Sequence, residues 1–237
     1  MPRLKAILLF VATLGFMVAS YSARNFRGYE PGDFPVPYTD PPIQPAGWAF
    51  AIWGLIYLWL IVHAGYGLFK RADDAGWDAP RWPLIISIAL GASWLEVAMT
   101  APLWATAQIW IMWAGAALAM TAAPKATQRW ILAAPIGLYA GWLTAASGVA
   151  TGVVLIGYGI LSETAASLVM LAVIAAIALT LTRRFAPPAS YPAGVIWALI
   201  GIIAANLSAA PVIAGAAALA AVALAFAAKP LLTSSWR

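Results

Sequence analysis

The sequence predicts an all-α integral membrane protein: a bundle of eight transmembrane helices with both termini in the cytoplasm. Composition is the first observation behind this prediction, because 64% of the 237 residues are hydrophobic and only 9% are charged, with a mean hydropathy of +0.88. A soluble domain has about 25% charged residues and cannot cover so much apolar surface. The spacing of the apolar segments and the positions of the basic residues are the other two observations.

The apolar residues fall into segments of transmembrane length, which is about 20 residues. Eight candidate spans follow one another, at 5–23, 47–69, 82–99, 103–123, 131–155, 164–182, 191–207 and 211–228. Proline, glycine and charged residues separate nearly all of them. The stretch 131–162 fits two interpretations, one long helix followed by a loop or one and a half helices.

The basic residues decide between these interpretations through the positive-inside rule. With eight spans and an internal N-terminus, only Arg24 and Arg27 of the 13 Lys and Arg residues lie outside. The inside segments hold the others: Arg3, Lys5, Lys70, Arg71, Arg81, Lys125, Arg129, Arg183, Arg184, Lys229 and Arg237. Splitting 131–162 into two spans would export the last four, so eight spans are favoured. These residues stand singly or in pairs and form no basic patch, so we expect no nucleic-acid partner. We expect the protein to lie in the inner (cytoplasmic) membrane.

Two segments near the N-terminus have alternative interpretations. The span 5–23 also fits a cleavable signal peptide, since Arg3 and Lys5 precede an apolar core that ends in Val18, Ala19 and Ser20. The outside loop 24–46 contains six prolines, which favour an extended, semi-rigid segment over a helix. This loop is either a lid over the helices or a solvated connector.

Twelve of the 13 tryptophans fall into two groups. Some lie at span ends or in loops, where interfacial anchoring is the usual role: Trp48, Trp77, Trp82, Trp104, Trp130 and Trp236. Others lie inside spans: Trp53, Trp59, Trp94, Trp110, Trp113 and Trp142. Helical spacing places Trp53 with Phe50 and Tyr57, and Trp142 with Tyr139. These side chains either bind a flat aromatic ligand or pack the helices together.

Three runs carry a family resemblance. The run at 41–57, PPIQPAGWAFAIWGLIY, resembles the opening of the second helix of the TspO/MBR family, the tryptophan-rich sensory proteins, with Trp48, Phe50, Trp53 and Tyr57 at matching positions. The run LGASW at 90–94 looks like that family's third-helix signature, with Trp94 in register. The run YAGWLTAA at 139–146 is similar to its fifth-helix signature, which places Tyr139 and Trp142.

The resemblance implies a division of the chain and a ligand. Residues 1–155 would form the five-helix TspO-like domain, and 156–237 would add three helices, as in a longer branch of the family. The family binds hydrophobic, often planar molecules such as porphyrins or sterols, in sensing or transport, and commonly forms homodimers. The implied ligand-binding residues are Trp48, Phe50, Trp53, Tyr57, Trp94, Tyr139 and Trp142.

The chain departs from the family at two polar positions of the implied pocket. The family typically carries an asparagine before its third-helix tryptophan and another after its fifth-helix tryptophan. Gly91 and Ala150 stand at those places here. Polar hydrogen-bonding groups in the pocket are therefore missing.

The residues needed for enzymatic or metal chemistry are sparse. The chain has no cysteine and one histidine, His63, and Glu96 is the only acid within a span. We therefore expect no enzyme activity, no cofactor and no metal. The alternatives to a ligand-binding receptor or carrier are an accessory membrane subunit and a small-solute transporter. Ser87 and Gly91, four residues apart, form a small-residue face that we expect to serve a homodimer.

Overall fold

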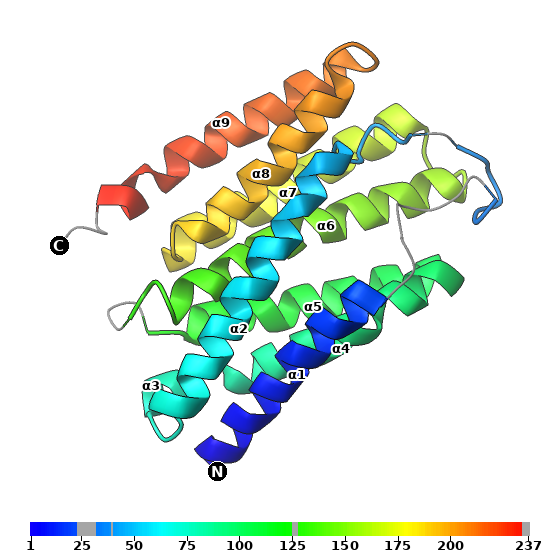
Figure 1. Cartoon of the computed structure of the whole chain (residues 1–237). Helices are drawn as coiled ribbons and strands as arrows, with labels where there is room; N and C mark the ends of the chain where they lie inside the picture. Colours follow the sequence, from blue (N-terminus) through cyan, green and yellow to red (C-terminus); the bar gives the residue numbers. More distant parts are fainter. Residues whose placement is uncertain (23–31, 39, 125–127, 234–237) are drawn as a thin grey trace.

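The computed structural model describes residues 1–22, 32–38, 40–124 and 128–233, and these residues form helices and no strand (Figure 1). The elements are α1 (Pro2–Ser22), the 3₁₀ helix η1 (Gly47–Ala51), α2 (Ile52–Lys70), α3 (Ala75–Asp78), α4 (Arg81–Thr100), α5 (Pro102–Ala122), α6 (Ala133–Gly157), α7 (Glu163–Phe185), α8 (Ser190–Asn206) and α9 (Pro211–Thr233).

The predicted eight-helix membrane bundle is confirmed. Seven helical segments of the described chain, each of 20 to 26 residues, are long and apolar enough to cross a bilayer. The eighth, α8, has 17 residues, which is the lower limit of a spanning helix. The stretch 131–162 is one helix, α6, followed by a loop, as the basic residues indicated.

Short, sharp connections end several helices. Ala101 alone separates α4 from α5, with an extended backbone (φ −149°, ψ 77°), and Pro102 begins α5 at a position where its missing N–H costs nothing. Ala186 ends α7 in the left-handed conformation (φ 44°, ψ 61°), and Pro187 and Pro188 prevent the helix from continuing. These signals explain why the predicted boundaries lie close to the observed ones.

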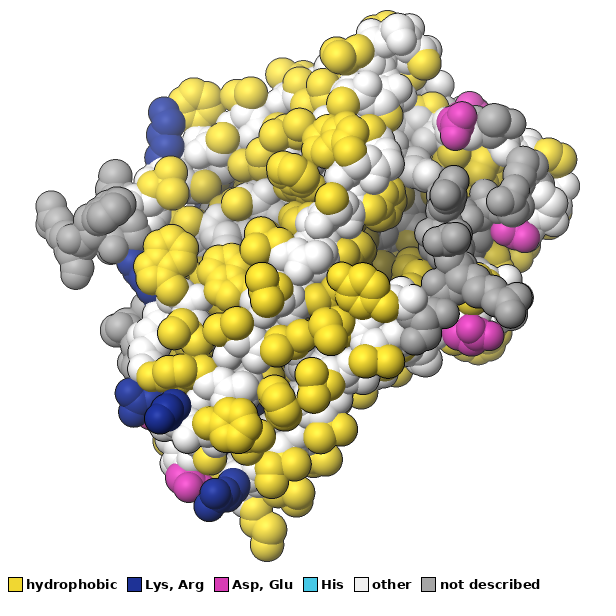
Figure 2. Space-filling view, viewed as in Figure 1, with side chains coloured by type: hydrophobic (Ala, Val, Ile, Leu, Met, Phe, Trp, Pro, Cys, Tyr) yellow, Lys and Arg dark blue, Asp and Glu magenta, His cyan; other side chains and the backbone are white. Residues whose placement is uncertain are grey.

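Alternation of the spans brings the beginning of α1 and the end of α9 to the same end of the bundle (Figure 1). The visible Lys and Arg side chains gather at this end, most Asp and Glu side chains lie at the other, and apolar side chains cover the surface between them (Figure 2). Arg24 and Arg27 lie outside the described residues. By the positive-inside rule, we expect the basic end to face the cytoplasm.

Buried Arg81 ties three segments together at the basic end. Its guanidinium is 1% exposed and donates hydrogen bonds to the carbonyl oxygens of Pro2, Ala72, Gly67 and Arg71. It also pairs with Asp78, at 3.3 Å. Only the planar, five-donor side chain of arginine can satisfy so many acceptors from one position, so the start of α1 and the end of α2 are held at a single point.

Helix α6 is the centre of the bundle, since 21 of its 25 residues are buried. It packs against α2, α5, α7 and α8. Gly141 of α6 faces the Tyr191 carbonyl of α8, and Gly194 of α8 faces the Leu138 carbonyl of α6, so two backbones meet where side chains would hold them apart. Close approach through glycine is the usual way in which helices associate in lipid.

The last three helices are built into this packing. Trp197 of α8 donates its indole N–H to the Ala49 carbonyl of η1 at 2.8 Å, and Asn206 donates to the Pro42 carbonyl at 2.8 Å. Gly201 of α8 lies against Pro45 and Ala49. Helix α8 therefore contacts both α6 and the segment before α2. The division at residue 155 stays a prediction.

The described part of the outside loop is anchored to α6 at two places. Val36 N donates to the Gly157 carbonyl at 2.9 Å, and the buried Phe34 ring lies against Gly157. Ile43 is fully buried and contacts Gly152. These contacts make residues 32–38 and 40–46 a cover on α6, whereas 23–31 and 39 lie outside the described residues.

The face formed by Ser87 and Gly91 is occupied within the chain. Ser87 is fully buried and donates to the Met112 carbonyl of α5 at 2.6 Å. A Cβ atom on Gly91 would lie 2.7 Å from the Phe16 ring of α1. The expectation that this face serves a dimer is therefore wrong, because α1 and α5 already cover it. A homodimer through another surface stays a prediction.

Candidate functional site

Four of the seven predicted ligand-binding residues form one aromatic cluster between α2 and α6. The rings of Trp53 and Tyr57 are stacked, with centroids 5.3 Å apart and planes at 18°. Trp53 also meets Trp142 edge to face at 6.1 Å and the Tyr139 ring at 6.3 Å. Offset stacks and edge-to-face contacts at these distances are the favourable arrangements of aromatic pairs.

Phe16 of α1 is a member of the cluster that the sequence analysis did not identify. Its ring lies 5.0 Å from Tyr57, 5.7 Å from Trp53 and 6.1 Å from Tyr139. It occupies the space beside Gly91. A side chain at position 91 and the Phe16 ring exclude each other, because a Cβ atom there would lie 2.7 Å from the ring.

Phe50 and Trp48 lie at the surface, in η1. Phe50 is 42% exposed and meets the Trp142 ring edge to face at 5.7 Å. Trp48 is 48% exposed and contacts Trp197 of α8 rather than the cluster, at 5.2 Å. The cluster therefore extends to the lipid-facing surface through Phe50.

Trp94 is partly buried in α4 and donates its indole N–H to the Ala105 carbonyl of α5 at 2.9 Å. This bond ties α4 to α5 near their shared turn. Trp94 therefore contacts α5 near the α4–α5 turn. This contact is separate from the ring contacts that join Trp53, Tyr57, Tyr139 and Trp142.

The tyrosine hydroxyls of the cluster are paired inside the protein. Tyr57 donates to Ser20 Oγ of α1 at 2.6 Å. The hydroxyl of Tyr139 is hydrogen-bonded to Ser87 Oγ of α4, with the two oxygen atoms 3.0 Å apart. These two bonds fix both rings, so α1 and α4 support the face that α2 and α6 present.

The buried indole N–H of Trp142 differs from those of six other tryptophans. Six indoles donate to acceptors of the protein: Trp59, Trp77, Trp94, Trp110, Trp113 and Trp197. Trp142 is 2% exposed, and within the described part of the chain its Nε1 has no hydrogen-bond partner. A buried donor without an acceptor costs about 1–3 kcal/mol, so this N–H is a feature that packing alone does not explain.

Comparison with known proteins adds the family to this geometry. A family model described as TSPO-like protein matches residues 5–229. The chain belongs to the TSPO-like family. The match covers all eight long helices, from α1 to most of α9, and therefore includes the last three. No curated protein and no solved structure matches the chain.

His63 and Glu96 both lie within predicted spans, and they have different surroundings in this TSPO-like protein. His63 is 1% exposed, its Nδ1 donates to the Ile131 carbonyl at 2.9 Å, and its ring stacks on Trp77 at 5.2 Å. Glu96 is exposed near the outer end of α4. In the described residues, no group of three or more His, Cys, Asp or Glu side chains is placed to hold a metal.

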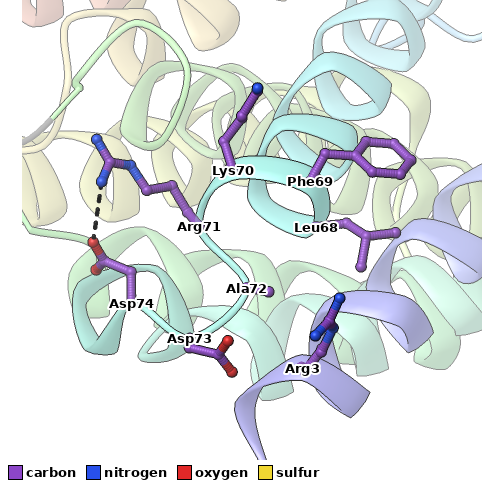
Figure 3. Close-up of a pocket in the computed structure, with 8 residues that line it drawn as sticks. All are labelled: Arg3, Leu68, Phe69, Lys70, Arg71, Ala72, Asp73 and Asp74. Atoms are coloured by element: carbon purple, nitrogen blue, oxygen red, sulfur yellow. Dashed lines mark ion pairs between the residues drawn. The ribbon is translucent and has the colours of Figure 1, made fainter.

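The basic end of this TSPO-like bundle has two hollows. The smaller, of about 370 Å³, lies where α2 meets α1, and charges of both signs line it (Figure 3). Arg71 and Asp74 form an ion pair at 4.0 Å there, beside Asp73, Lys70 and Arg3 (Figure 3). The larger, of about 580 Å³, is a groove among the ends of α5 to α9, lined mainly by apolar side chains with Arg129 and Arg184.

Proposed function

We propose that this TSPO-like membrane protein is a receptor or carrier for a hydrophobic, planar molecule of the porphyrin or sterol kind. The ligand binds against the cluster of Trp53, Tyr57, Tyr139 and Trp142. The observation that carries the proposal is the buried indole N–H of Trp142, which has no acceptor among the described residues. A ligand that offers an oxygen or nitrogen acceptor at this point removes the cost of that unpaired donor.

The ligand reaches the cluster from the bilayer. Phe50 is 42% exposed and covers the edge of Trp142, so rotation of this one side chain opens the indole to the lipid side. Because the stacked rings of Trp53 and Tyr57 also touch Phe16, this pair is held rigidly and has little adaptable space behind it. A rigid aromatic face favours a planar ligand, which loses little conformational entropy on binding.

The interaction energies fit a micromolar affinity. Aromatic pairs contribute about 0.5–1.5 kcal/mol each beyond area burial. Apolar burial contributes about 25 cal/mol per Å². Two or three ring contacts with this burial and one hydrogen bond reach about −8 kcal/mol, the value for a dissociation constant near 1 μM.

The test is a titration of the purified protein with protoporphyrin, followed by the shift of the porphyrin absorption band. Trp53→Ala removes the stacking face, and we expect about tenfold weaker binding. Trp142→Phe keeps a ring and removes the N–H, and we expect about fivefold to tenfold weaker binding from the lost hydrogen bond. Trp104→Phe, at a side chain that is 74% exposed on α5, is the matched control and leaves the affinity unchanged.

Ring-to-ring contact throughout the cluster favours a second candidate, an accessory membrane subunit whose tryptophans only pack helices. On this interpretation Trp53→Ala lowers the thermal stability in detergent without any saturable porphyrin binding in the wild type. Equal loss of binding in all three variants, including Trp104→Phe, points to the same conclusion. A sterol titration, measured by competition with porphyrin, separates the two ligand classes.

A further inference from the structure

We propose that the smaller hollow at the basic end binds the headgroup of a phospholipid that carries a primary amine, of the phosphatidylethanolamine kind. The phosphate lies at Lys70 and Arg71, and the ammonium group lies at Asp73. The end of α2, the loop after it and Arg3 of α1 form this hollow of about 370 Å³ (Figure 3). None of its lining residues belongs to the aromatic cluster between α2 and α6.

The hollow holds charges of both signs, and most of them are free within the part of the chain that the structure describes. The five charged side chains are Arg3, Lys70, Arg71, Asp73 and Asp74. Only Arg71 and Asp74 form an ion pair with each other, and no ion pair or side-chain hydrogen bond joins Arg3, Lys70 or Asp73 to a described residue. Such a surface is complementary to a ligand that carries both a negative and a positive group.

Arg71 has unused donors of the kind that bind phosphate. Its Nη1 lies 4.0 Å from Asp74 Oδ2, which is close enough for an ion pair but too long for a hydrogen bond. Its Nε has no hydrogen-bond partner among the described residues, whereas nearby Arg81 donates to four backbone carbonyls. The Arg71 side chain is 40% exposed, so a ligand can reach it. A phosphate supplies the acceptors that this guanidinium lacks, because arginine binds phosphate through paired N–H donors.

The two aspartates of the hollow differ in what they already bind. Asp74 Oδ1 accepts from the backbone N–H groups of Gly76 and Trp77, at 2.9 and 3.2 Å, and so caps α3. Its other oxygen faces Arg71. Asp73 is exposed and makes neither kind of contact with the described residues. Asp73 is therefore the carboxylate that is available to an ammonium group.

The chemistry of Asp73 selects the headgroup. The ethanolamine ammonium has three N–H donors, as a lysine side chain has, and donates charge-assisted hydrogen bonds to a carboxylate. The choline group of phosphatidylcholine has a positive charge but no N–H, and the glycerol of phosphatidylglycerol has no positive charge. Of these three headgroups, only ethanolamine matches both the basic side chains and the free carboxylate.

The hollow lies at the edge of the apolar surface of the bundle. Phe69 is 73% exposed beside it and meets the Phe10 ring of α1 edge to face at 6.0 Å. Helical spacing continues this apolar surface to Val62 on α2 and to Ile7 on α1, which are 45% and 43% exposed. Charged side chains of both signs border apolar ones where α1 begins (Figure 2). The headgroup enters the hollow while the acyl chains lie along the apolar surface.

The experiment measures lipid retention by the full-length protein in a neutral detergent. Native mass spectrometry follows an equimolar mixture of dioleoyl phosphatidylethanolamine, phosphatidylcholine and phosphatidylglycerol. We expect the wild type to bind phosphatidylethanolamine about tenfold more tightly than the other two lipids. Asp73→Asn removes the carboxylate and should lower the affinity for phosphatidylethanolamine about fivefold to tenfold. Glu96→Gln, at an exposed acid of the outer end, is the matched control and should change it by less than about twofold.

The phosphate side of the hollow has its own variant. Lys70→Gln/Arg71→Gln should weaken the binding of all three lipids about tenfold without changing their order, because all three carry a phosphate. Arg183→Gln/Arg184→Gln removes the same charge from exposed side chains at the same end and should have less than about a threefold effect. Circular dichroism and size-exclusion chromatography check the fold of each variant. Because the lipids compete within one sample, their ratio does not depend on the fraction of folded protein.

Four outcomes would overturn the proposal. Equal retention of phosphatidylcholine and phosphatidylethanolamine by the wild type would mean that no N–H of the headgroup is recognised. Equal retention of phosphatidylglycerol would mean that the site takes the phosphate alone. Equal effects of Asp73→Asn and Glu96→Gln would remove the role of the carboxylate. Displacement of the lipid by free phosphoethanolamine at the same concentration would mean that the site is not a lipid site.

Discussion

At the residue scale, the glycine at position 91 and the phenylalanine at position 16 depend on each other. A Cβ atom on Gly91 would lie 2.7 Å from Cε2 of Phe16, so the Phe16 ring can enter the cluster only because position 91 has no side chain. An asparagine at this place, as the resemblance to the family implies, would compete with the ring for the same space. Glycine at position 91 therefore admits an aromatic ring from α1.

Introducing an asparagine at position 91 tests this competition for space. We expect Gly91→Asn alone to destabilise the protein by about 1–3 kcal/mol through overpacking. The double variant Gly91→Asn/Phe16→Ala should lose less stability than the sum of the two single changes, because the clash is absent. Thermal unfolding in detergent measures all three variants, and additive losses would contradict direct competition between the two side chains.

The left-handed Ala186 at the end of α7 offers a second change at this scale. Its φ of 44° is unfavourable for alanine and acceptable for glycine. We expect Ala186→Gly to raise the free energy of unfolding by about 1 kcal/mol. As a control, Ala176→Gly at an exposed position within α7 should lower it by about 0.5–1 kcal/mol. An Ala186→Gly protein with a lower melting temperature would show that this strain is absent.

At the element scale, contact between α6 and α8 depends on paired glycines. We expect Gly141→Ala to separate these helices, because a Cβ atom there meets the carbonyl of Tyr191. The expected cost is about 1–3 kcal/mol. Gly54→Ala in α2 is the matched control, since nothing lies within 4 Å of its added Cβ and alanine is the better helix former. Similar melting temperatures for both variants would contradict close backbone contact between α6 and α8.

At the scale of the whole molecule, an even number of spans places the first and last helices' free ends together at the basic end of the bundle. The chain has no cysteine, so single cysteines report sidedness without background. We expect Val36→Cys and Ser208→Cys to react with a membrane-impermeant thiol reagent in intact cells, and Ala79→Cys and Arg183→Cys to react only after permeabilisation. Labelling of position 183 from outside would contradict the eight-span topology.

Much of the candidate site was predictable because the family signatures identify positions along helices. Trp53, Tyr57, Tyr139 and Trp142 lie together, as their place in the second and fifth spans indicated. The place of Phe16 in the cluster was not predictable, since nothing in the sequence of the span 5–23 distinguishes Phe16 from the other aromatic residues of that span. The sequence also could not show that Trp94 has different contacts from the other four aromatic residues, because its bond to Ala105 depends on how the chain turns from α4 into α5.

The sequence by itself determined the class of protein, the number of spans and their relative orientation. Those properties depend on the hydrophobicity of each segment and on the placement of charge between segments, and both are local in the chain. Only the tertiary structure decided which faces meet: that Phe16 fills the space beside Gly91, that the Trp142 N–H is left without an acceptor, and that Arg129 and Arg184 share one groove. In a bilayer nearly every face of a helix is apolar, so hydrophobic pattern cannot distinguish the packed face from the lipid face. Shape and hydrogen bonding between distant segments make that choice.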